Sequence, residues 1–295
     1  MAKSRREFLI QSSAALAATA LVMGDPIRSN SDPLGKPAGL QLYSVMAQLK
    51  KDFDGTLHQV RTIGYQEVEM AGFFGKKPLE IKRSLDNAGL HCGSMHIFSE
   101  GLDATMQCGV AIGAKYIITS FIAPDATQGK KVGGLTLEDY KVMAGKCNHI
   151  GEQAKNAGLQ LAYHNHNGEF KPLPGGKGYD ELLKQTDPDL VKLELDCGWM
   201  SAAGLNPATY IGKYPDRYRL LHIKDFKPTP RPLYGGGEDP EGAELGRGHV
   251  DYGPIFRAAK NAGVEWYYVE QEPPFKEMPA FEAMKVNYEY LQQFK

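Results

Sequence analysis

This sequence has few cysteines, nearly balanced charges and few long apolar runs. Its 295 residues include only four cysteines, and none of them forms a CxxC pair or a zinc-finger spacing. We therefore expect buried thiols, with one disulfide as the open alternative. The 34 Lys and Arg residues nearly balance the 35 Asp and Glu residues, which excludes a basic surface for nucleic acid or acidic membranes. The cysteines are Cys92, Cys108, Cys147 and Cys197.

The first thirty residues predict an export signal. Arg5 and Arg6 precede a soft apolar run, Ala14–Met23, which is shorter than the roughly twenty residues that span a bilayer. An amphipathic helix is the alternative, but the run has no polar face. The paired arginines resemble a twin-arginine signal, so we expect residues 1–30 to direct a folded protein through the Tat export machinery to the periplasm, without a stable membrane anchor.

From residue 37 to residue 295 the sequence alternates short apolar runs with helical patterns, which predicts a single (β/α)8 TIM barrel of parallel strands. A doubly wound sheet is the alternative, but no GxGxxG turn follows the first apolar run. The predicted strands are Leu40–Val45, Tyr65–Met70, His91–Ile97, Tyr116–Ser120, Leu159–His164, Val191–Leu195, Leu220–Ile223 and Trp266–Val269. The predicted helices are Gly55–Ile63, Pro78–Ala88, Leu102–Ile112, Leu137–Ala157, Tyr179–Gln185, Pro207–Gly212, Pro254–Ala262 and Pro279–Phe294.

A glycine recurs where the predicted helices end. Asn87-Ala88-Gly89, Asn156-Ala157-Gly158 and Asn261-Ala262-Gly263 each precede an apolar strand. Glycine adopts the left-handed conformation that ends a helix and redirects the chain. The repetition supports one structural unit used many times.

Charged and imidazole side chains gather at the carboxyl ends of the predicted strands, where buried positions would otherwise be apolar. Barrel enzymes carry their chemistry at this end, so we expect the active site there. Because side chains alternate along a strand, residues two apart share a face. The pairs that do so are Glu194 and Asp196, His222 and Lys224, and Glu270 and Glu272.

Four successive strands each deliver one residue that can bind a metal: His164, Asp196, His222 and Glu270. Mixed imidazole and carboxylate ligands suit Mn²⁺, Zn²⁺, Co²⁺ or Fe²⁺, and Mg²⁺ remains an alternative. Export after folding lets the protein bind its ion in the cytoplasm, away from competing periplasmic Zn²⁺ and Cu²⁺, so Mn²⁺ is favoured. A buried salt-bridge network is the competing interpretation, but it leaves too many carboxylates unpaired.

These strand ends resemble the xylose isomerase-like TIM-barrel superfamily, in its sugar phosphate isomerase/epimerase branch, which includes tagatose-3-epimerase-like enzymes and inosose dehydratase. The motifs that carry the resemblance are Leu193-Glu194-Leu195-Asp196, His222-Ile223-Lys224-Asp225, Gly246-Arg247-Gly248-His249-Val250-Asp251 and Glu270-Gln271-Glu272. The resemblance implies one metal ion bound by Glu, Asp, His and Glu from strands 5 to 8. Asp196, His222 and Glu270 match the last three.

The strand-5 position departs from the family pattern. Where the family has glutamate, this chain has His164, and His166 and Glu169 are alternative ligands from the same segment. In the epimerase-like relatives the two glutamates are opposed bases, so one base is replaced here. A His–Asn–His segment also resembles relatives that are keto-sugar lyases and dehydratases.

The resemblance implies proton abstraction next to a carbonyl, with a metal-stabilised enediolate. Glu270 is the predicted ligand and base, and His164 or His166 the opposed acid or base. Lys224 could protonate a leaving group or orient a hydroxyl; a salt bridge with Asp196 or Glu194 is the alternative. The predicted contacts to a small carbohydrate are Glu69, His96, Glu169, Trp199 and His249.

The sequence favours a metal-dependent sugar isomerase or epimerase. The main alternative is a lyase or dehydratase that eliminates a β-substituent from a keto-sugar or 3-keto-glycoside at the same site. A three-zinc nuclease and a non-catalytic sugar binder are the other classes considered; the balanced charge and the export signal disfavour the nuclease. A homodimer is left open, because barrels of this kind often pair.

Overall fold

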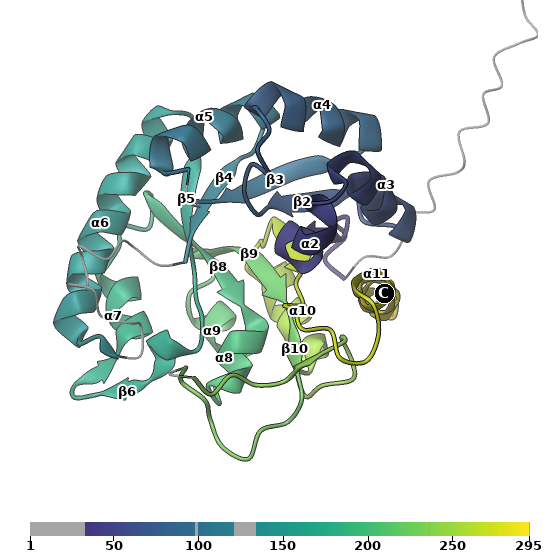
Figure 1. The fold of residues 1–295 in the computed structure, drawn as a ribbon. Helices are drawn as coiled ribbons and strands as arrows, with labels where there is room; N and C mark the ends of the chain where they lie inside the picture. Colours follow the sequence, from purple (N-terminus) through teal and green to yellow (C-terminus); the bar gives the residue numbers. More distant parts are fainter. Residues whose placement is uncertain (1–32, 98–99, 121–133, 236, 295) are drawn as a thin grey trace, which may run out of the picture. The chain divides into compact units, whose positions relative to one another are not determined.

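A closed barrel of eight parallel strands forms the centre of the protein (Figure 1). The structure, a computed structural model, describes residues 33–97, 100–120, 134–235 and 237–294. Around the barrel the strands follow the order β1-β12-β9-β8-β5-β4-β3-β2, and helices surround them. This arrangement confirms the predicted (β/α)8 fold.

The barrel strands are β1 (Gly39–Gln41), β2 (Glu67–Met70), β3 (His91–His96), β4 (Tyr116–Thr119), β5 (Gln160–His164), β8 (Val191–Asp196), β9 (Tyr218–Ile223) and β12 (Trp266–Val269). The helices are α2 (Met46–Leu49), α3 (Phe53–Ile63), α4 (Pro78–Ala88), α5 (Leu102–Ile112), α6 (Leu137–Asn156), α7 (Gly178–Gln185), α8 (Cys197–Ala202), α9 (Pro207–Lys213), α10 (Tyr252–Asn261) and α11 (Ala280–Leu291), with the 3-10 helices η1 (Leu42–Val45) and η3 (Gly168–Phe170). Two small hairpins pair β6 (Pro172–Leu173) with β7 (Gly176–Lys177), and β10 (Asp225–Phe226) with β11 (Gly242–Ala243).

Side-chain caps fix where several helices begin. Asp52 accepts a hydrogen bond from the Gly55 backbone at 3.0 Å, so α3 starts two residues before the predicted Gly55. Thr136 and Asp139 form a reciprocal capping box at the start of α6. Such caps satisfy backbone N–H groups that have no partner inside the helix. Asp251 caps α10 through the Gly253 N–H at 3.0 Å.

Glycine ends several helices as the sequence predicts. Gly89 and Gly113 are the C-caps of α4 and α5, with φ values of 68° and 82° in the left-handed region. Gly158 and Gly263 follow α6 and α10 with φ values of 79° and 70°. Residues other than glycine are strained in this conformation, so the recurring glycine marks each return of the chain into the barrel.

The predicted first strand, Leu40–Val45, is wrong in its extent. β1 ends at Gln41, and the next four residues form η1. The Gln41 side chain accepts a hydrogen bond from the Tyr43 backbone N–H at 2.5 Å, which turns the chain out of the sheet. At the other end of the chain, α11 is shorter than the predicted Pro279–Phe294.

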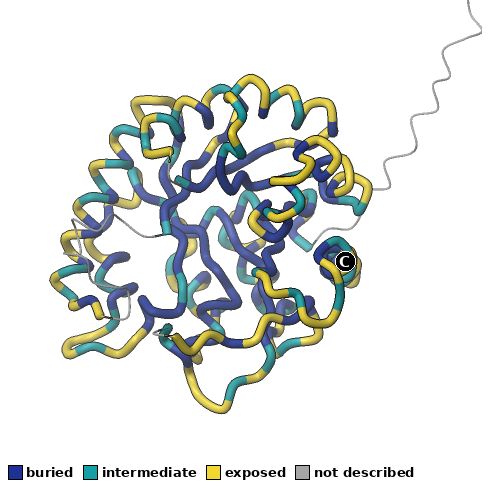
Figure 2. Tube along the Cα trace, viewed as in Figure 1, coloured by how far each residue is buried: buried dark blue, intermediate teal, exposed yellow. Residues whose placement is uncertain are grey.

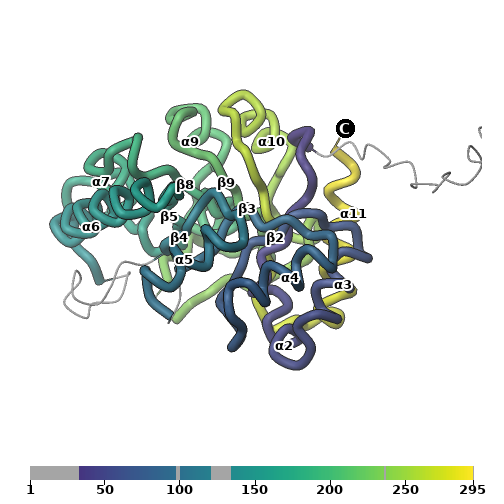
Figure 3. The backbone as a smooth tube through the Cα atoms, turned by 90° about the horizontal axis from the view of Figure 1, so that it is seen from above, coloured from purple at the N-terminus to yellow at the C-terminus, as the bar shows by residue number. Residues whose placement is uncertain are grey.

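Apolar side chains fill the space between the strands and the helices. The buried residues follow the strands and the inner faces of the helices, and the outer helix faces are exposed (Figure 2). The last helix, α11, packs against α3 and closes the ring of helices (Figures 1 and 3). The Tyr65 hydroxyl donates to the Met284 carbonyl at 2.9 Å across this junction.

The predicted export signal, residues 1–30, lies outside the described residues. Among the helices of the described ranges, none combines the length and apolar character needed to cross a membrane. All four cysteines are buried and free, which confirms the expected thiols.

Candidate active site

Asp196, the last residue of β8, uses its two carboxylate oxygens differently. Oδ1 accepts a hydrogen bond from the Trp199 backbone N–H at 2.8 Å and caps α8. Oδ2 lies 3.1 Å from Lys224 Nζ and accepts no hydrogen bond from a described residue. The cap therefore fixes the orientation of the second oxygen toward the barrel interior.

The ammonium of Lys224 is buried and surrounded by carboxylates. Its Nζ lies 2.5 Å from Glu272 Oε1, 2.7 Å from Glu270 Oε2 and 3.1 Å from Asp196 Oδ2. Burial lowers the pKa of Lys224, but these three carboxylates outweigh burial and hold it well above its usual range. Of the two salt bridges considered as the alternative role of Lys224, the one with Asp196 is present.

His222 stands at the centre of the site. Its Nδ1 lies 3.1 Å from Glu270 Oε2 and 3.9 Å from Asp196 Oδ2. Its Nε2 lies 2.7 Å from Glu69 Oε1. Burial alone would lower the pKa of His222, but the surrounding carboxylates raise it well above its usual value.

A second group of polar side chains lies around Glu194. Glu194 Oε2 is 3.1 Å from His164 Nδ1, 3.4 Å from His96 Nε2 and 3.3 Å from His222 Nε2. Glu69 Oε1 is 2.9 Å from His96 Nε2, and its other oxygen accepts from Ser94. All of these residues are buried.

Two groups of residues could therefore hold a metal ion. Within each group the ligand atoms lie within 4.8 Å of one another. One buried oxygen of the second group, Glu194 Oε1, has no hydrogen-bond donor among the described residues, which supports the fit there, because a buried carboxylate oxygen needs a partner. The first group is Asp196, His222 and Glu270; the second is His96, His164, Glu194 and His222.

A cavity of about 620 Å³ lies beside the first group, at the carboxyl ends of β9 and β12. Trp199 lines it with its ring packed on Phe226, centroids 4.8 Å apart, and its indole N–H has no partner among the described residues. Burial, followed by the charge of the Lys224 ammonium, lowers the pKa of the His166 imidazole to about 4, so the imidazole is neutral near pH 7. The polar lining includes His166, Asn167, Lys224, Gln271 and Glu272.

Asp225 ties the next loop to the cavity wall. Its carboxylate accepts hydrogen bonds from the backbone N–H groups of Gly246, Gly248, His249 and Val250 at 2.9 to 3.1 Å. A β-carbon at Gly248 would overlap this carboxylate, which explains the glycine there. Asp225 therefore acts as the anchor of the loop 246–250.

A family model described as xylose isomerase-like TIM barrel matches residues 57–289. The chain belongs to this family. The resemblance seen in the sequence is thereby confirmed.

An inosose dehydratase of Lacticaseibacillus casei is 26% identical over 277 residues, covering 82% of this chain and 90% of the relative. The structure of a sugar phosphate isomerase/epimerase from Parabacteroides distasonis is 26% identical, with a TM-score of 0.70, and covers 87% of this chain and 93% of that one. The structure of the IOLI protein with a bound zinc atom, at 16% identity and a TM-score of 0.65, covers 88% and 98% and shows the same fold. The family thus includes dehydratases and isomerases or epimerases.

The structure of this xylose isomerase-like barrel brings three of the four predicted metal ligands together: Asp196, His222 and Glu270. His164 contacts Glu194 instead, because the register of β5 against β8 places these two residues side by side. Burial, followed by the charge of His222, lowers the pKa of His164 well below its usual value. Its role as a ligand beside Asp196 stays a prediction.

The predicted carbohydrate contacts lie in different places. Trp199 lines the cavity, whereas Glu69 and His96 lie with Glu194 in the second group. Glu169 is buried and accepts hydrogen bonds from the Tyr163 hydroxyl at 3.1 Å and the His166 backbone at 3.0 Å. His249 is exposed, and its ring contacts the Phe226 carbonyl. Sugar contact by these residues stays a prediction.

Sequence reasoning did not assign Glu194, Glu272 or Asn167 to the site. The period-two spacing of Glu194 before Asp196, and of Glu272 after Glu270, was the available signal. Asn167 follows the end of β5 in a loop, where spacing gives no direction for a side chain. Its amide nitrogen is buried without a described partner, and the residue lines the cavity.

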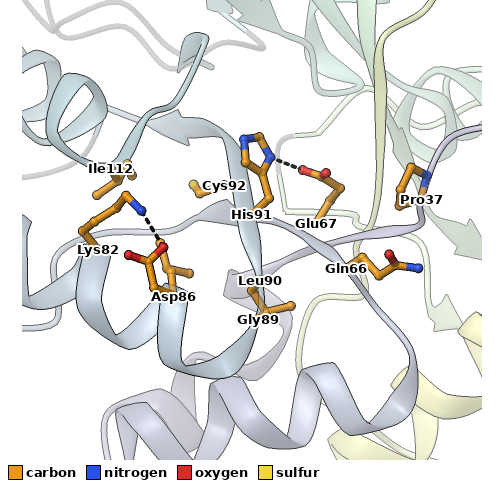
Figure 4. Close-up of a pocket in the computed structure, with 11 residues that line it drawn as sticks. Pro37, Gln66, Glu67, Lys82, Asp86, Gly89, Leu90, His91, Cys92 and Ile112 are labelled. Atoms are coloured by element: carbon orange, nitrogen blue, oxygen red, sulfur yellow. Dashed lines mark hydrogen bonds and ion pairs between the residues drawn. The ribbon is translucent and has the colours of Figure 1, made fainter. Parts of the chain in front are cut away.

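A second cavity, of about 420 Å³, lies at the opposite end of the barrel (Figure 4). It is lined from the starts of β2 and β3 and the end of α4. His91 points toward Glu67, with Nδ1 2.6 Å from Oε2, and Lys82 points toward Asp86 at 2.5 Å. These lining charges pair with each other within the cavity wall.

Proposed function

We propose that this protein is a metal-dependent carbon–oxygen lyase that eliminates a β-substituent from a keto-sugar, a keto-cyclitol or a 3-keto-glycoside. The observation that carries the proposal is the cavity wall, where the imidazole of His166 and the ammonium of Lys224 lie beside the Asp196–His222–Glu270 group. The similarity to inosose dehydratases over most of the chain supports elimination.

Elimination needs one group that takes a proton next to the carbonyl and one that gives a proton to the leaving oxygen. His166 is the base in this proposal, because a neutral imidazole accepts a proton at Nδ1 or Nε2. Lys224 is the acid, because its Nζ carries protons and borders the same cavity. Trp199 supplies an apolar ring and an unpaired N–H to the bound sugar.

A divalent ion would be held by Asp196, His222 and Glu270, and when bound it would polarise the substrate carbonyl and stabilise negative charge on its oxygen. Contacts with neighbouring groups hold these three side chains in position to bind the ion. Glu270 contacts both His222 and Lys224, while the Trp199 backbone fixes Asp196. Mn²⁺ remains the ion that the predicted export of a folded protein favours.

Epimerisation of the family type uses two opposed glutamates, and the side chains of this chain favour elimination instead. The strand-5 position holds His164, which is buried against Glu194. Glu270 is engaged by Lys224 at 2.7 Å and by His222 at 3.1 Å. One imidazole and one ammonium therefore replace two free carboxylates at the cavity.

The test is incubation of the metal-loaded protein with a ketohexose, an inosose and a 3-keto-glycoside in D₂O. We expect release of water or the aglycone, with the absorbance of a conjugated enone. Deuterium incorporation without cleavage of a C–O bond would overturn the lyase proposal in favour of an isomerase or epimerase. The absence of both outcomes with all three substrates would indicate a binding protein.

A further inference from the structure

His222 presents its two ring nitrogens to two different sets of carboxylates. Nδ1 faces the group assigned above, 3.1 Å from Glu270 Oε2. Nε2 lies 3.3 Å from Glu194 Oε2 and 2.7 Å from Glu69 Oε1. The second set therefore lies at the other edge of the same imidazole and is separate from the cavity group.

The second set lies deeper in the barrel. Glu194 precedes Asp196 by two residues on the same face of β8, which corresponds to roughly 6.6 Å along a strand. The register pairs Glu194 with His164 of β5, whereas it pairs Asp196 with His222 of β9. The deeper set thus belongs to the layer nearer the amino ends of the strands.

The distances around Glu194 match a tetrahedral ligand set. Four ligands bound at about 2.0 to 2.1 Å lie roughly 3.3 Å from one another in a tetrahedron. The three edges that meet at Glu194 Oε2 agree with this value, at 3.1, 3.4 and 3.3 Å from the nitrogens of His164, His96 and His222, and all four ligand atoms lie within 4.8 Å of one another. Three imidazoles and one carboxylate are ligands that zinc and similar transition metals prefer.

Two further observations point to a cation at this place. Glu194 Oε1 is buried and accepts no hydrogen bond from any described residue, a condition that costs free energy unless a ligand satisfies it. In addition, of four buried carboxylates the Lys224 ammonium contacts two, Asp196 and Glu270, and the other two face the imidazoles of His96 and His222, so a divalent ion between these imidazoles would add positive charge beside them. The carboxylates are Glu69, Glu194, Asp196 and Glu270.

We propose that His96, His164, Glu194 and the Nε2 of His222 form a second divalent-metal site, of the zinc type, beneath the site of the proposed lyase reaction. When both sites are filled, the His222 imidazole bridges two ions and releases its ring protons to solvent. The deeper ion compensates the negative charge of the buried carboxylates. It also fixes the His222 ring, whose Nδ1 faces the Asp196–His222–Glu270 site. This inference goes beyond the proposed function, since the deeper ion does not touch the substrate cavity.

The test uses the full chain, stripped with a chelator and titrated with Zn²⁺, with bound metal counted by calorimetry and elemental analysis. We expect two equivalents in the unaltered protein and one in Glu194→Gln, His96→Gln and Asp196→Asn. With Co²⁺ as probe, the visible absorption of the tetrahedral site should persist in Asp196→Asn and disappear in His96→Gln. Glu244→Gln is the matched control and should keep two equivalents, because Glu244 is also buried but lies outside both groups.

One equivalent in the unaltered protein would overturn the second site. Two equivalents in both Glu194→Gln and His96→Gln would do so as well. Because each variant removes a different ligand, either one that folds decides the question. The readout is metal content rather than turnover, so failure of the lyase proposal leaves this result intact.

Discussion

At the scale of single residues, His166 is the group on which the proposed elimination depends most directly. His166→Asn should lower kcat/KM by about 10²- to 10⁴-fold, because a general base contributes that much, while metal content stays unchanged. His149→Asn, at an exposed histidine of α6, is the matched control and should keep full activity. Steady-state kinetics and metal analysis on both variants check the prediction. A His166→Asn protein within threefold of the unaltered rate would show that another group takes the proton.

The pair of His91 and Glu67 gives a pH dependence away from the active site. The hydrogen bond from Glu67 raises the pKa of His91, and partial burial opposes it (Figure 4). The pair therefore stabilises the fold fully below the unfolded-state pKa of about 6.5, and the contribution is lost as pH rises through the folded-state pKa. His91 is half-exposed, so we expect less than about 1 kcal/mol. Urea unfolding from pH 5.5 to 8.5 should show this loss in the unaltered protein and not in His91→Gln; parallel pH curves would contradict it.

The sequence predicts which residues belong to the site better than it predicts which of them lie together. Asp196, His222 and Glu270 follow from polar residues at strand ends, and the structure brings them together. The position of His164 does not follow, because it depends on how β5 and β8 are staggered. A sequence gives the alternation within one strand, whereas the stagger between strands arises from closure of the whole barrel.

At the scale of elements, the loop 246–250 is held by one carboxylate. Asp225→Ala would leave the N–H groups of Gly246, Gly248 and Val250 without this acceptor, while that of His249 keeps the Phe226 carbonyl at 3.0 Å, so we expect a loss of roughly 2–4 kcal/mol in the free energy of unfolding. Asp225→Asn keeps one acceptor oxygen and should lose less. Urea unfolding measures the loss, and hydrogen exchange should accelerate at Gly248 and Val250. Unchanged exchange at these amides would show that the loop is held by other contacts.

Helix limits were more predictable than the extent of the first strand. Helix α4 has the predicted bounds, because Pro78 starts it and Gly89 ends it through strong local preferences. The segment after Gln41 reads as a strand because it is apolar, yet a side-chain hydrogen bond to Tyr43 turns it into η1. A sequence predicts a helix cap only where the residue is of a type that commonly caps helices, and glutamine is not such a type.

At the scale of the whole molecule, the near-zero net charge conceals an uneven distribution. The barrel interior gathers carboxylates at one end, and within the described part of the chain the Lys224 ammonium contacts two of them, Asp196 and Glu270, with a permanent positive charge. Metal ions at the two groups would supply the remaining positive charge. The fold therefore brings together side chains from β2, β3, β5, β8 and β9, with Glu270 directly after β12, and no single segment of the chain contains the site.

The first thirty residues carry the last prediction, which concerns where the whole protein works. We propose that Arg5 and Arg6 direct export of the folded barrel, because paired arginines before a short apolar run match the twin-arginine pattern. Arg5→Lys together with Arg6→Lys should retain most of the protein in the cytoplasm of an expressing bacterium, as measured by fractionation and immunoblotting. Arg28→Lys, outside the pair, is the control and should leave export unchanged. Equal periplasmic amounts of the double variant and the unaltered protein would contradict twin-arginine export, and with it the argument that the ion is bound before the protein leaves the cytoplasm.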